Sequence, residues 1–279
     1  MQEISESKKG ITGSTLKWIA VFSMLIDHSA CILISPILVE HGIYSIADCS
    51  AAYITELIEA GSVGWFYLAY QIMRRLIGRL AFPIYCFCLI EGFSRTGNKK
   101  KYAGRLAAFA LLSEVPFDLG FYNSLFDMEH QNVFFTLLLG FLMIWGMDTL
   151  KRQVKRTWLA VSGQVFLFLA AAFLAEWISC DYGARGILAL VLLYQFRYQK
   201  GMQILVGCIA FIWEPAALLA FIPIGLYRGG RGRQNRWFFY AFYPVHILIL
   251  YFLTKILQDP NTESFLCFIY ENFLEIKIL

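Results

Sequence analysis

An aspartate and a histidine stand next to each other in the first long apolar stretch of the chain. Asp27 and His28 lie within residues 16–39, a segment otherwise suited to a membrane-spanning helix. An ionisable side chain in hydrocarbon costs at least about 2.5 kcal/mol on insertion scales, so such residues usually face a bundle interior or a polar cavity. A neutral imidazole is also the side chain best suited to proton transfer near neutral pH. We therefore take His28 as a candidate catalytic base.

Helical geometry decides which residues can act with this pair. Lys17 and His28 are eleven residues apart, almost three whole turns, so they share one face of the helix, with His28 about 16 Å deeper. Asp27 is turned by about 100° from His28 and needs a partner from another helix. We expect that partner to be Arg79, at the external end of the next span. Such a pair either belongs to the active site or only holds the first helix in register.

A second intramembrane histidine lies in the last apolar segment. His246 and Tyr243 share a helix face at a spacing of three residues, and Pro244 frees a backbone carbonyl near them. A hydrogen-bonded core histidine and a functional one explain this pattern equally well. Asn132 and Thr136 form another polar stripe, and we count them as candidate substrate ligands, although such residues more often join helices by hydrogen bonds.

The composition indicates what kind of protein carries these residues. Of the 279 residues, 58% are hydrophobic and 17% aromatic, whereas only 16% are charged. A soluble domain carries roughly 25% charged residues, so we expect an all-α polytopic membrane helix bundle surrounded by lipid bilayer. The net charge of +4 comes from short basic clusters between apolar segments, a pattern that does not indicate nucleic-acid binding. An odd number of cysteines, mostly inside spans, predicts neither a disulfide framework nor a metal site.

The loops between the apolar segments alternate in charge. Acidic stretches at residues 40–62, 118–129 and 176–181 alternate with basic junctions at residues 95–105, 151–156 and 197–200. By the positive-inside rule, the basic junctions and the N-terminus lie in the cytoplasm. Within residues 201–227, proline at position 215 breaks the helical hydrogen-bond ladder. We interpret that segment as a hairpin of two short helices, which returns the following arginines to the cytoplasm.

The pattern predicts about nine spanning helices in a single integral membrane domain over residues 1–279. Residues 1–14 would form a polar cytoplasmic N-terminus, and residues 255–279 an external tail that ends in an interfacial helix. The stretch 65–78, with its arginines, fits poorly, because a full span there would invert every later loop. We interpret it as an interfacial or half-inserted helix that leads into a span over residues 80–93.

A series of motifs, in order along nearly the whole chain, resembles one known family. The motifs are MLIDH at 24–28, GRLAFPI at 78–84, EGFSRTGN at 91–98, NVFFTLLLG at 132–140, DYG at 181–183 and FYAFYPVH at 239–246. Together they resemble the TraX family of conjugation-associated membrane proteins. The resemblance implies an integral membrane acetylase of the bacterial cytoplasmic membrane, because the founding member is linked to N-terminal acetylation of a pilin subunit.

A more distant similarity concerns the first helix. The spacing of Lys17 and His28 is similar to an Arg-x10-His signature in transmembrane acyltransferases that modify envelope sugars. Lysine keeps the positive charge of the signature arginine but lacks its bidentate fork.

Basic residues near the cytoplasmic mouth agree with acetyl-CoA as the donor, because this cosubstrate is cytosolic and multiply anionic. The donor contacts that we expect are Lys17, Arg95, Lys101, Arg105 and Arg228. Orientation by the positive-inside rule alone accounts for most of these charges. Arg95 and Arg105 are the strongest candidates, since a guanidinium matches phosphate in a bidentate way. The thioester would then approach His28, which deprotonates the acceptor or carries the acetyl group transiently.

The acceptor is an amine or a hydroxyl, and three carriers stay open: a peptide N-terminus such as that of a pilin, an envelope glycan and a small molecule. Two other functional classes stay open as well. A proton-coupled small-molecule transporter would also place Asp, His and a hinged proline in its core, and internal structural repeats would favour it. A non-catalytic membrane assembly factor would tolerate the loss of His28.

Overall fold

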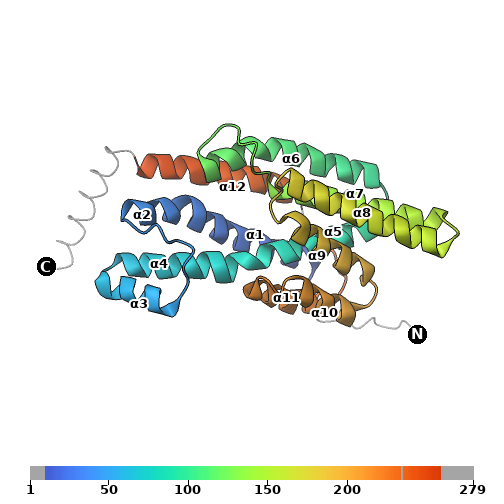
Figure 1. Cartoon of the computed structure of the whole chain (residues 1–279), viewed down its shortest axis with the longest axis horizontal. Coiled ribbons are helices and arrows are strands. Elements are labelled where there is room, and N and C mark those ends of the chain that lie inside the picture. The colour runs from blue at the N-terminus through green and yellow to red at the C-terminus, as the bar shows by residue number, and fades with distance from the viewer. Residues whose placement is uncertain (1–9, 234, 259–279) are drawn as a thin grey trace.

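The computed structural model describes residues 10–233 and 235–258, and most of them are helical, which confirms the all-α bundle (Figure 1). The expected tail helix falls outside these residues. The helices are α1 (Gly13–Ser29), α2 (Ser35–Glu40), α3 (Ala51–Ala60), α4 (Val63–Gln71), α5 (Ala81–Arg95), α6 (Lys99–Tyr122), α7 (Val133–Gln153), α8 (Thr157–Trp177), α9 (Gly183–Gln195), α10 (Lys200–Ala210), α11 (Phe221–Leu226) and α12 (Arg236–Leu257). Two π-helical turns, Ala30–Ile34 and Ile72–Ile77, and two 3₁₀ turns, Gly78–Leu80 and Pro215–Ala220, connect some of them.

Five helices in the described part of the chain are long and apolar enough to cross a membrane. They are Gly13–Glu40, Val63–Arg95, Val133–Gln153, Thr157–Trp177 and Trp237–Leu257. Shorter apolar helices lie over Gly183–Gln195, Lys200–Ala210 and Pro215–Leu226. Large apolar side chains such as Phe166, Phe173 and Phe252 are exposed on the outer faces, where bilayer lipid would cover them. The chain is therefore a multi-pass membrane protein.

The stretch 65–78 is not a separate interfacial helix, so this expectation was wrong. Residues 63–95 form one continuous helix, in which a π turn and a 3₁₀ turn join α4 to α5. Its arginines find partners inside the protein, namely Arg74 with Asp27, Arg75 with Gln71, and Arg79 with Glu214. Because two of these charges face carboxylates and the third is hydrogen-bonded to neutral oxygens, the helix does not have to break to expel them from the bilayer. One helix still makes one crossing, so the predicted order of loops is kept.

The segment after α9 folds back on itself, as the proline at position 215 predicted. The first arm, α10, ends at Ala210, and Pro215 begins the 3₁₀ turn that leads into α11. Phe221 packs on Gly207 and Gly225 lies beside Ile204, so the two arms run antiparallel. The turn of this hairpin carries Glu214 toward the helix of residues 63–95.

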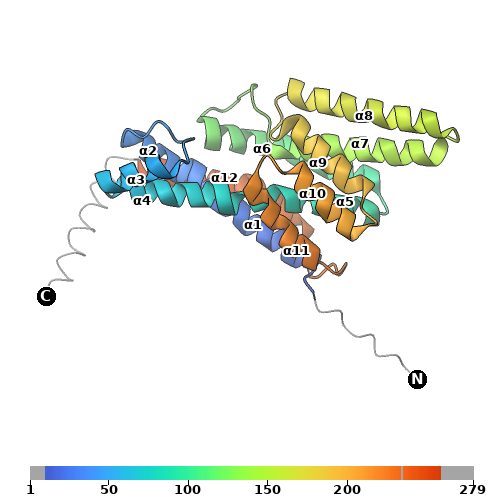
Figure 2. The ribbon, with the colours of Figure 1, turned by 60° about the horizontal axis from the view of Figure 1, so that its bottom comes forward.

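The candidate residues are held where α1, α5, α6, α7 and α12 pack together. The rings of Trp18 and Phe238 are 5.1 Å apart at one end of α1 and α12, and Thr254 donates a 2.9 Å hydrogen bond to the Ile32 carbonyl at the other. These two helices, the first and the last of the bundle, therefore run side by side and parallel (Figure 1). Figure 2 shows α7 and α8 as a hairpin at one edge, packed against the helices that follow.

Residues 35–71 form a lobe with a small core of its own, which we call the outer lobe. Leu38, Tyr67 and Tyr70 are buried in it, between α2, α3 and α4. The Tyr67 hydroxyl donates to the Ser45 carbonyl at 3.0 Å, and Gln71 Nε2 donates to the Ile46 carbonyl at 2.9 Å. The two π turns join this lobe to the rest of the bundle, one at each of its ends.

Cysteine labelling with a membrane-impermeant maleimide tests the loop order. In a variant without the exposed native Cys49 and without Cys267 of the expected external tail, cysteines at Ser50 and Leu125 should react in intact cells. Cysteines at Asn98 and Gln153 should react only after permeabilisation, because they lie in basic junctions. A cysteine at Arg233 should behave like the second group. Labelling of that site in intact cells would mean that the α10–α11 hairpin does not return the chain to the cytoplasm.

Candidate active site

The two histidines singled out by the sequence meet between α1 and α12. His28 Nδ1 lies 2.7 Å from His246 Nε2, and the two rings are nearly parallel, with 11° between their planes. His246 Nδ1 lies 2.6 Å from the backbone carbonyl oxygen of Phe242. His246 is buried and His28 is half-buried. The sequence indicated each histidine separately, but not that they touch.

These contacts fix which ring nitrogens carry protons. A carbonyl oxygen only accepts hydrogen bonds, so His246 Nδ1 must donate to Phe242. In a neutral His246, Nε2 is then bare and accepts the hydrogen bond from His28 Nδ1. Nε2 of a neutral His28 is left with a lone pair, which a general base or nucleophile requires. His246 therefore sets the tautomer of His28.

Two aromatic rings hold the His28 imidazole in place. Phe121, near the end of α6, meets it edge to face with 5.1 Å between the ring centroids, and Tyr243 does the same at 5.8 Å. Tyr243 is buried on α12, one turn before His246. Packing on both sides limits rotation of the imidazole, so its tautomer and its direction are both set before a substrate arrives.

Asp27 pairs with Arg74 and not with Arg79, so the predicted partner was wrong. Arg74 Nη1 lies 3.0 and 2.8 Å from the two carboxylate oxygens of Asp27. Arg79 faces Glu214 instead, with 3.4 Å between Arg79 Nε and the carboxylate. The prediction assumed that residues 65–78 lie outside the bundle, whereas the continuous helix carries Arg74 to the level of Asp27.

Gly78 allows the two helices to approach closely at this level. A Cβ atom at position 78 would collide with the Asp27 side chain. One turn before Asp27, the Ser23 hydroxyl donates to the Ile77 carbonyl at 2.6 Å, which satisfies a backbone group near the π turn. The glycine therefore determines the distance at which α1 and the helix of residues 63–95 pack.

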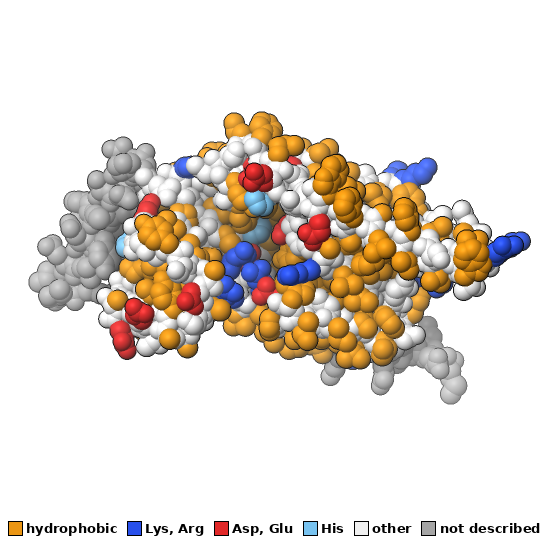
Figure 3. Space-filling model, in the orientation of Figure 1, with side chains coloured by type: hydrophobic (Ala, Val, Ile, Leu, Met, Phe, Trp, Pro, Cys, Tyr) orange, Lys and Arg blue, Asp and Glu red, His pale blue; other side chains and the backbone are white. Residues whose placement is uncertain are grey.

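Charged groups gather in a hollow beside the ion pairs. Figure 3 shows Lys or Arg, Asp or Glu, and His side chains together in the middle of one face, between α4 and the helices α9 to α11. The side chains of Arg74 and Asp27 are 31% and 15% exposed, so solvent reaches their pair. Asp181, in the loop between α8 and α9, is also exposed, yet the surrounding helices desolvate it and raise the pKa of its carboxyl to about 6, against the influence of Arg74.

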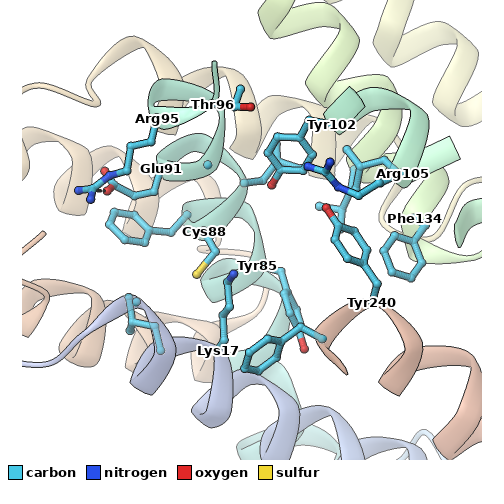
Figure 4. Close-up of a pocket in the computed structure, with 18 of the residues that line it drawn as sticks. Lys17, Tyr85, Cys88, Glu91, Arg95, Thr96, Tyr102, Arg105, Phe134 and Tyr240 are labelled. Atoms are coloured by element: carbon cyan, nitrogen blue, oxygen red, sulfur yellow. Dashed lines mark ion pairs between the residues drawn. The ribbon is translucent and has the colours of Figure 1, made fainter. Parts of the chain in front are cut away.

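A pocket of about 400 Å³ approaches the histidine pair from another direction, between α1, α5, α6, α7 and α12 (Figure 4). In Figure 4, Lys17 and Cys88 point toward one another on one wall, and Tyr102, Arg105 and Tyr240 stand on the opposite wall. Tyr243 and Met24 also line this pocket, and Met24 lies one helical turn before His28. His28 itself does not line the pocket, but these two neighbours do, so the inner end of the pocket lies near the candidate base.

Some of the basic residues expected to bind the donor line the pocket, and others do not. Lys17, Arg95 and Arg105 line it, whereas Lys101 and Arg228 do not. Arg95 is already engaged, because its Nη2 lies 2.9 Å from Glu91 and its Nη1 donates to the Gly229 carbonyl at 2.7 Å. Arg105 is therefore the stronger candidate of the two arginines for contact with a ligand.

The two polar residues of α7 have structural partners. Asn132 Nδ2 donates to the Ala110 carbonyl at 2.8 Å, and its Oδ1 caps α7 by accepting from the Phe134 N–H. Thr136 donates to the Asp181 carbonyl. These contacts join helices and do not face the pocket. Among the predicted substrate ligands, Tyr243 lines the pocket.

Most residues of the pocket were not singled out from the sequence, and three polar ones illustrate why. Tyr85, Arg231 and Tyr240 line the pocket. Nothing in the sequence distinguishes Tyr85 and Tyr240 from tyrosines that lie at a membrane interface. Arg231 belongs to a loop that contains several arginines. Arg231 reaches the site because the loop lies along the start of α1, where Gly13 N–H donates to the Gly230 carbonyl at 2.8 Å. No local sequence pattern predicts such a contact.

Comparison with known proteins agrees with these observations. A model of the TraX protein family matches residues 12–254, which include both histidines, Asp27 and the whole pocket. The "Probable fimbrial assembly protein FimC, serogroup H1" of Dichelobacter nodosus is 28% identical over 265 residues, covering 84% of this chain and 92% of that protein. No solved structure matches this chain. From the match over residues 12–254, and from the motifs that predicted it, the chain belongs to the TraX family.

Proposed function

We propose that this protein is an integral membrane acetyltransferase, which moves an acetyl group from cytosolic acetyl-CoA to an amine or hydroxyl acceptor. The observation that carries the proposal is a basic, aromatic pocket whose inner end lies beside a histidine with an oriented, bare Nε2. The same assignment places the protein in the bacterial cytoplasmic membrane with its N-terminus inside.

The pocket is suited to the donor in charge, shape and position. Lys17, Arg105 and Arg231 bring positive charge to a cavity otherwise walled largely by aromatic and aliphatic side chains. A volume of about 400 Å³ is within the usual range of small-molecule sites. Its basic side opens at the start of α1, beside the junctions assigned to the cytoplasm. An anionic cytosolic thioester would therefore meet attraction at the mouth and an apolar interior beyond it.

His28 Nε2 would supply the chemistry at the inner end. The acceptor nitrogen or oxygen attacks the thioester carbonyl carbon while His28 removes its proton. A new C–N or C–O bond forms, the C–S bond breaks, and CoA leaves as a thiolate that takes the proton from His28. A transient acetyl group on the same Nε2 is the covalent variant of this route. His246 stabilises the imidazolium by accepting the Nδ1 hydrogen bond.

The acceptor would reach His28 from the hollow that holds Asp27 and Arg74. This approach leaves the pocket to the donor, so the two substrates meet at one atom from opposite directions. The name of the Dichelobacter nodosus relative refers to fimbrial assembly. Among the possible acceptors it favours the peptide N-terminus of a pilin-type subunit, whose amine needs a base for attack.

Acetyl-CoA binding by the purified protein in detergent tests the donor assignment. Arg105→Ala should weaken binding by about 1.5 to 3 kcal/mol, because a charged contact to the ligand is lost. Lys101→Ala is the matched control, since Lys101 lies on the same helix, is exposed and does not line the pocket. Calorimetry should therefore show a loss in the first variant and none in the second. If the folded wild-type protein gives no heat with acetyl-CoA, the acetyltransferase proposal fails and a transporter or assembly role gains weight.

A further inference from the structure

Two polar groups in the pocket wall have no hydrogen-bond partner within the described part of the chain. They are the hydroxyl of Tyr85, on α5, and Nε of Arg105, on α6, and both atoms are buried. Both residues line the pocket. Native proteins rarely leave a buried donor unsatisfied, because its desolvation is costly. These two groups therefore indicate that an occupant of the pocket completes their hydrogen bonds.

The chemistry of the two groups restricts that occupant. The Nε–H of arginine can only donate, and the Tyr85 hydroxyl can donate as well. The Arg105 guanidinium lies 5.3 Å from the ring centre of Tyr102 and 6.0 Å from that of Tyr240, and these two rings hold it in place. Phe134 and Leu137 are among the side chains that line the rest of this space. The matching ligand is a slender chain that carries hydrogen-bond acceptors, and the amide and thioester carbonyl oxygens of an acylated arm are of this kind.

The volume of the pocket and the position of its cations indicate that only part of the donor lies inside it. A cavity of about 400 Å³ lies near the lower end of the usual range for ligand sites. It suits an extended pantetheine arm, but not that arm together with a phosphorylated adenosine. Arg95 has a side chain that is 51% exposed, and Arg231 is also exposed, so these cations are accessible to a nucleotide that remains at the mouth.

We infer that the pocket binds the acyl-pantetheine arm of CoA, with the Tyr85 hydroxyl and Arg105 Nε donating to its carbonyl oxygens. The nucleotide stays at the rim near Arg231 and contributes less to affinity. This inference rests on the proposed function and names the part of the donor that the site recognises. It assigns Tyr85 as a binding residue for the thioester substrate.

The test compares three ligands on the purified full-length protein in detergent: acetyl-CoA, S-acetylpantetheine and adenosine 3′,5′-bisphosphate. S-acetylpantetheine should bind within about tenfold of acetyl-CoA, whereas the bisphosphate should bind at least about a hundredfold more weakly. Tyr85→Phe should weaken acetyl-CoA and S-acetylpantetheine by the same factor, about tenfold. Arg231→Ala should weaken acetyl-CoA and leave S-acetylpantetheine unchanged. Tyr198→Phe is the matched control, because Tyr198 is exposed and does not line the pocket.

Thermal unfolding of the ligand-free Tyr85→Phe protein separates a binding role from a structural one. Because the hydroxyl has no partner among the described residues, its removal should leave the melting temperature unchanged or raise it. A lower melting temperature would show an internal partner and overturn the inference. The inference would also be overturned if the bisphosphate bound as tightly as acetyl-CoA and Tyr85→Phe did not change acetyl-CoA binding. The acetyltransferase proposal would survive that result. If neither thioester binds, the proposed function itself fails.

Discussion

Replacing His28 by alanine should abolish acetyl transfer and leave acetyl-CoA binding intact. The substitution removes the bare Nε2 that takes the acceptor proton, and the loss of a positioned base typically costs about 10²- to 10⁴-fold in rate. The pocket and its cations are untouched, so affinity for the donor should stay at the wild-type value. The measurement is transfer of a labelled acetyl group to a peptide amine by the purified protein, alongside calorimetry with acetyl-CoA. Wild-type turnover in this variant would remove His28 from the mechanism.

Two variants of His246 and one of His41 serve as controls for this prediction. His246→Gln keeps a carbonyl oxygen that can accept from His28 Nδ1, so it should retain more activity than His246→Leu, which cannot accept. His41→Ala should leave activity unchanged, because His41 is exposed on the end of α2 and bonds only locally. Equal loss in both His246 variants would show that this residue only packs against His28.

Asp27→Asn should lower the stability of the folded protein, because it leaves Arg74 as an uncompensated cation. Breaking a buried pair by removing one partner costs about 3 to 5 kcal/mol, and the 31% exposure of Arg74 places the expected loss at or below the lower limit. Asp27→Asn combined with Arg74→Gln should recover part of that loss. The melting temperature in detergent measures both effects.

Arg79→Gln is the matched control for the partner of Asp27. Arg79 lies on the same helix but faces Glu214, so Asp27→Asn with Arg79→Gln should show no recovery. Equal recovery with either arginine would mean that Asp27 interacts with both cations to a similar extent. No recovery with Arg74→Gln would contradict the pair seen in the structure.

Sequence reasoning found the residues of the site better than their contacts. Asp27, His28 and His246 stood out because ionisable groups are rare in apolar helices, and this signal is local. The hydrogen bond between His28 and His246 joins positions 218 residues apart in the chain, and it depends on how the first and last helices pack. The loop charges assign a side of the membrane to each loop by the positive-inside rule, and this assignment stays a prediction.

The errors have a common physical cause. Residues 65–78 were interpreted as an interfacial or half-inserted helix because a full span there would invert every later loop, and because a single helix viewed alone offers its arginines no partners. The partners of Arg74 and Arg79 come from α1 and from the turn of the α10–α11 hairpin. Tyr85 and Arg231 were missed for the same reason, because their importance depends on the cavity that other helices enclose around them.

The two π turns impose a rule on insertions and deletions in this region of the chain. A π turn holds one residue more than an α turn in about the same rotation, so losing that residue restores a regular helix and leaves the flanking helix faces in their direction. Both turns connect to the outer lobe, at Ala30–Ile34 and Ile72–Ile77. A deletion inside α4 has no such extra residue to remove, so it would turn the residues beyond it by about 100° and misalign the hydrogen bonds of Tyr67 and Gln71. Changes of length by one residue should therefore be tolerated at the two π turns and not within the helices of the lobe.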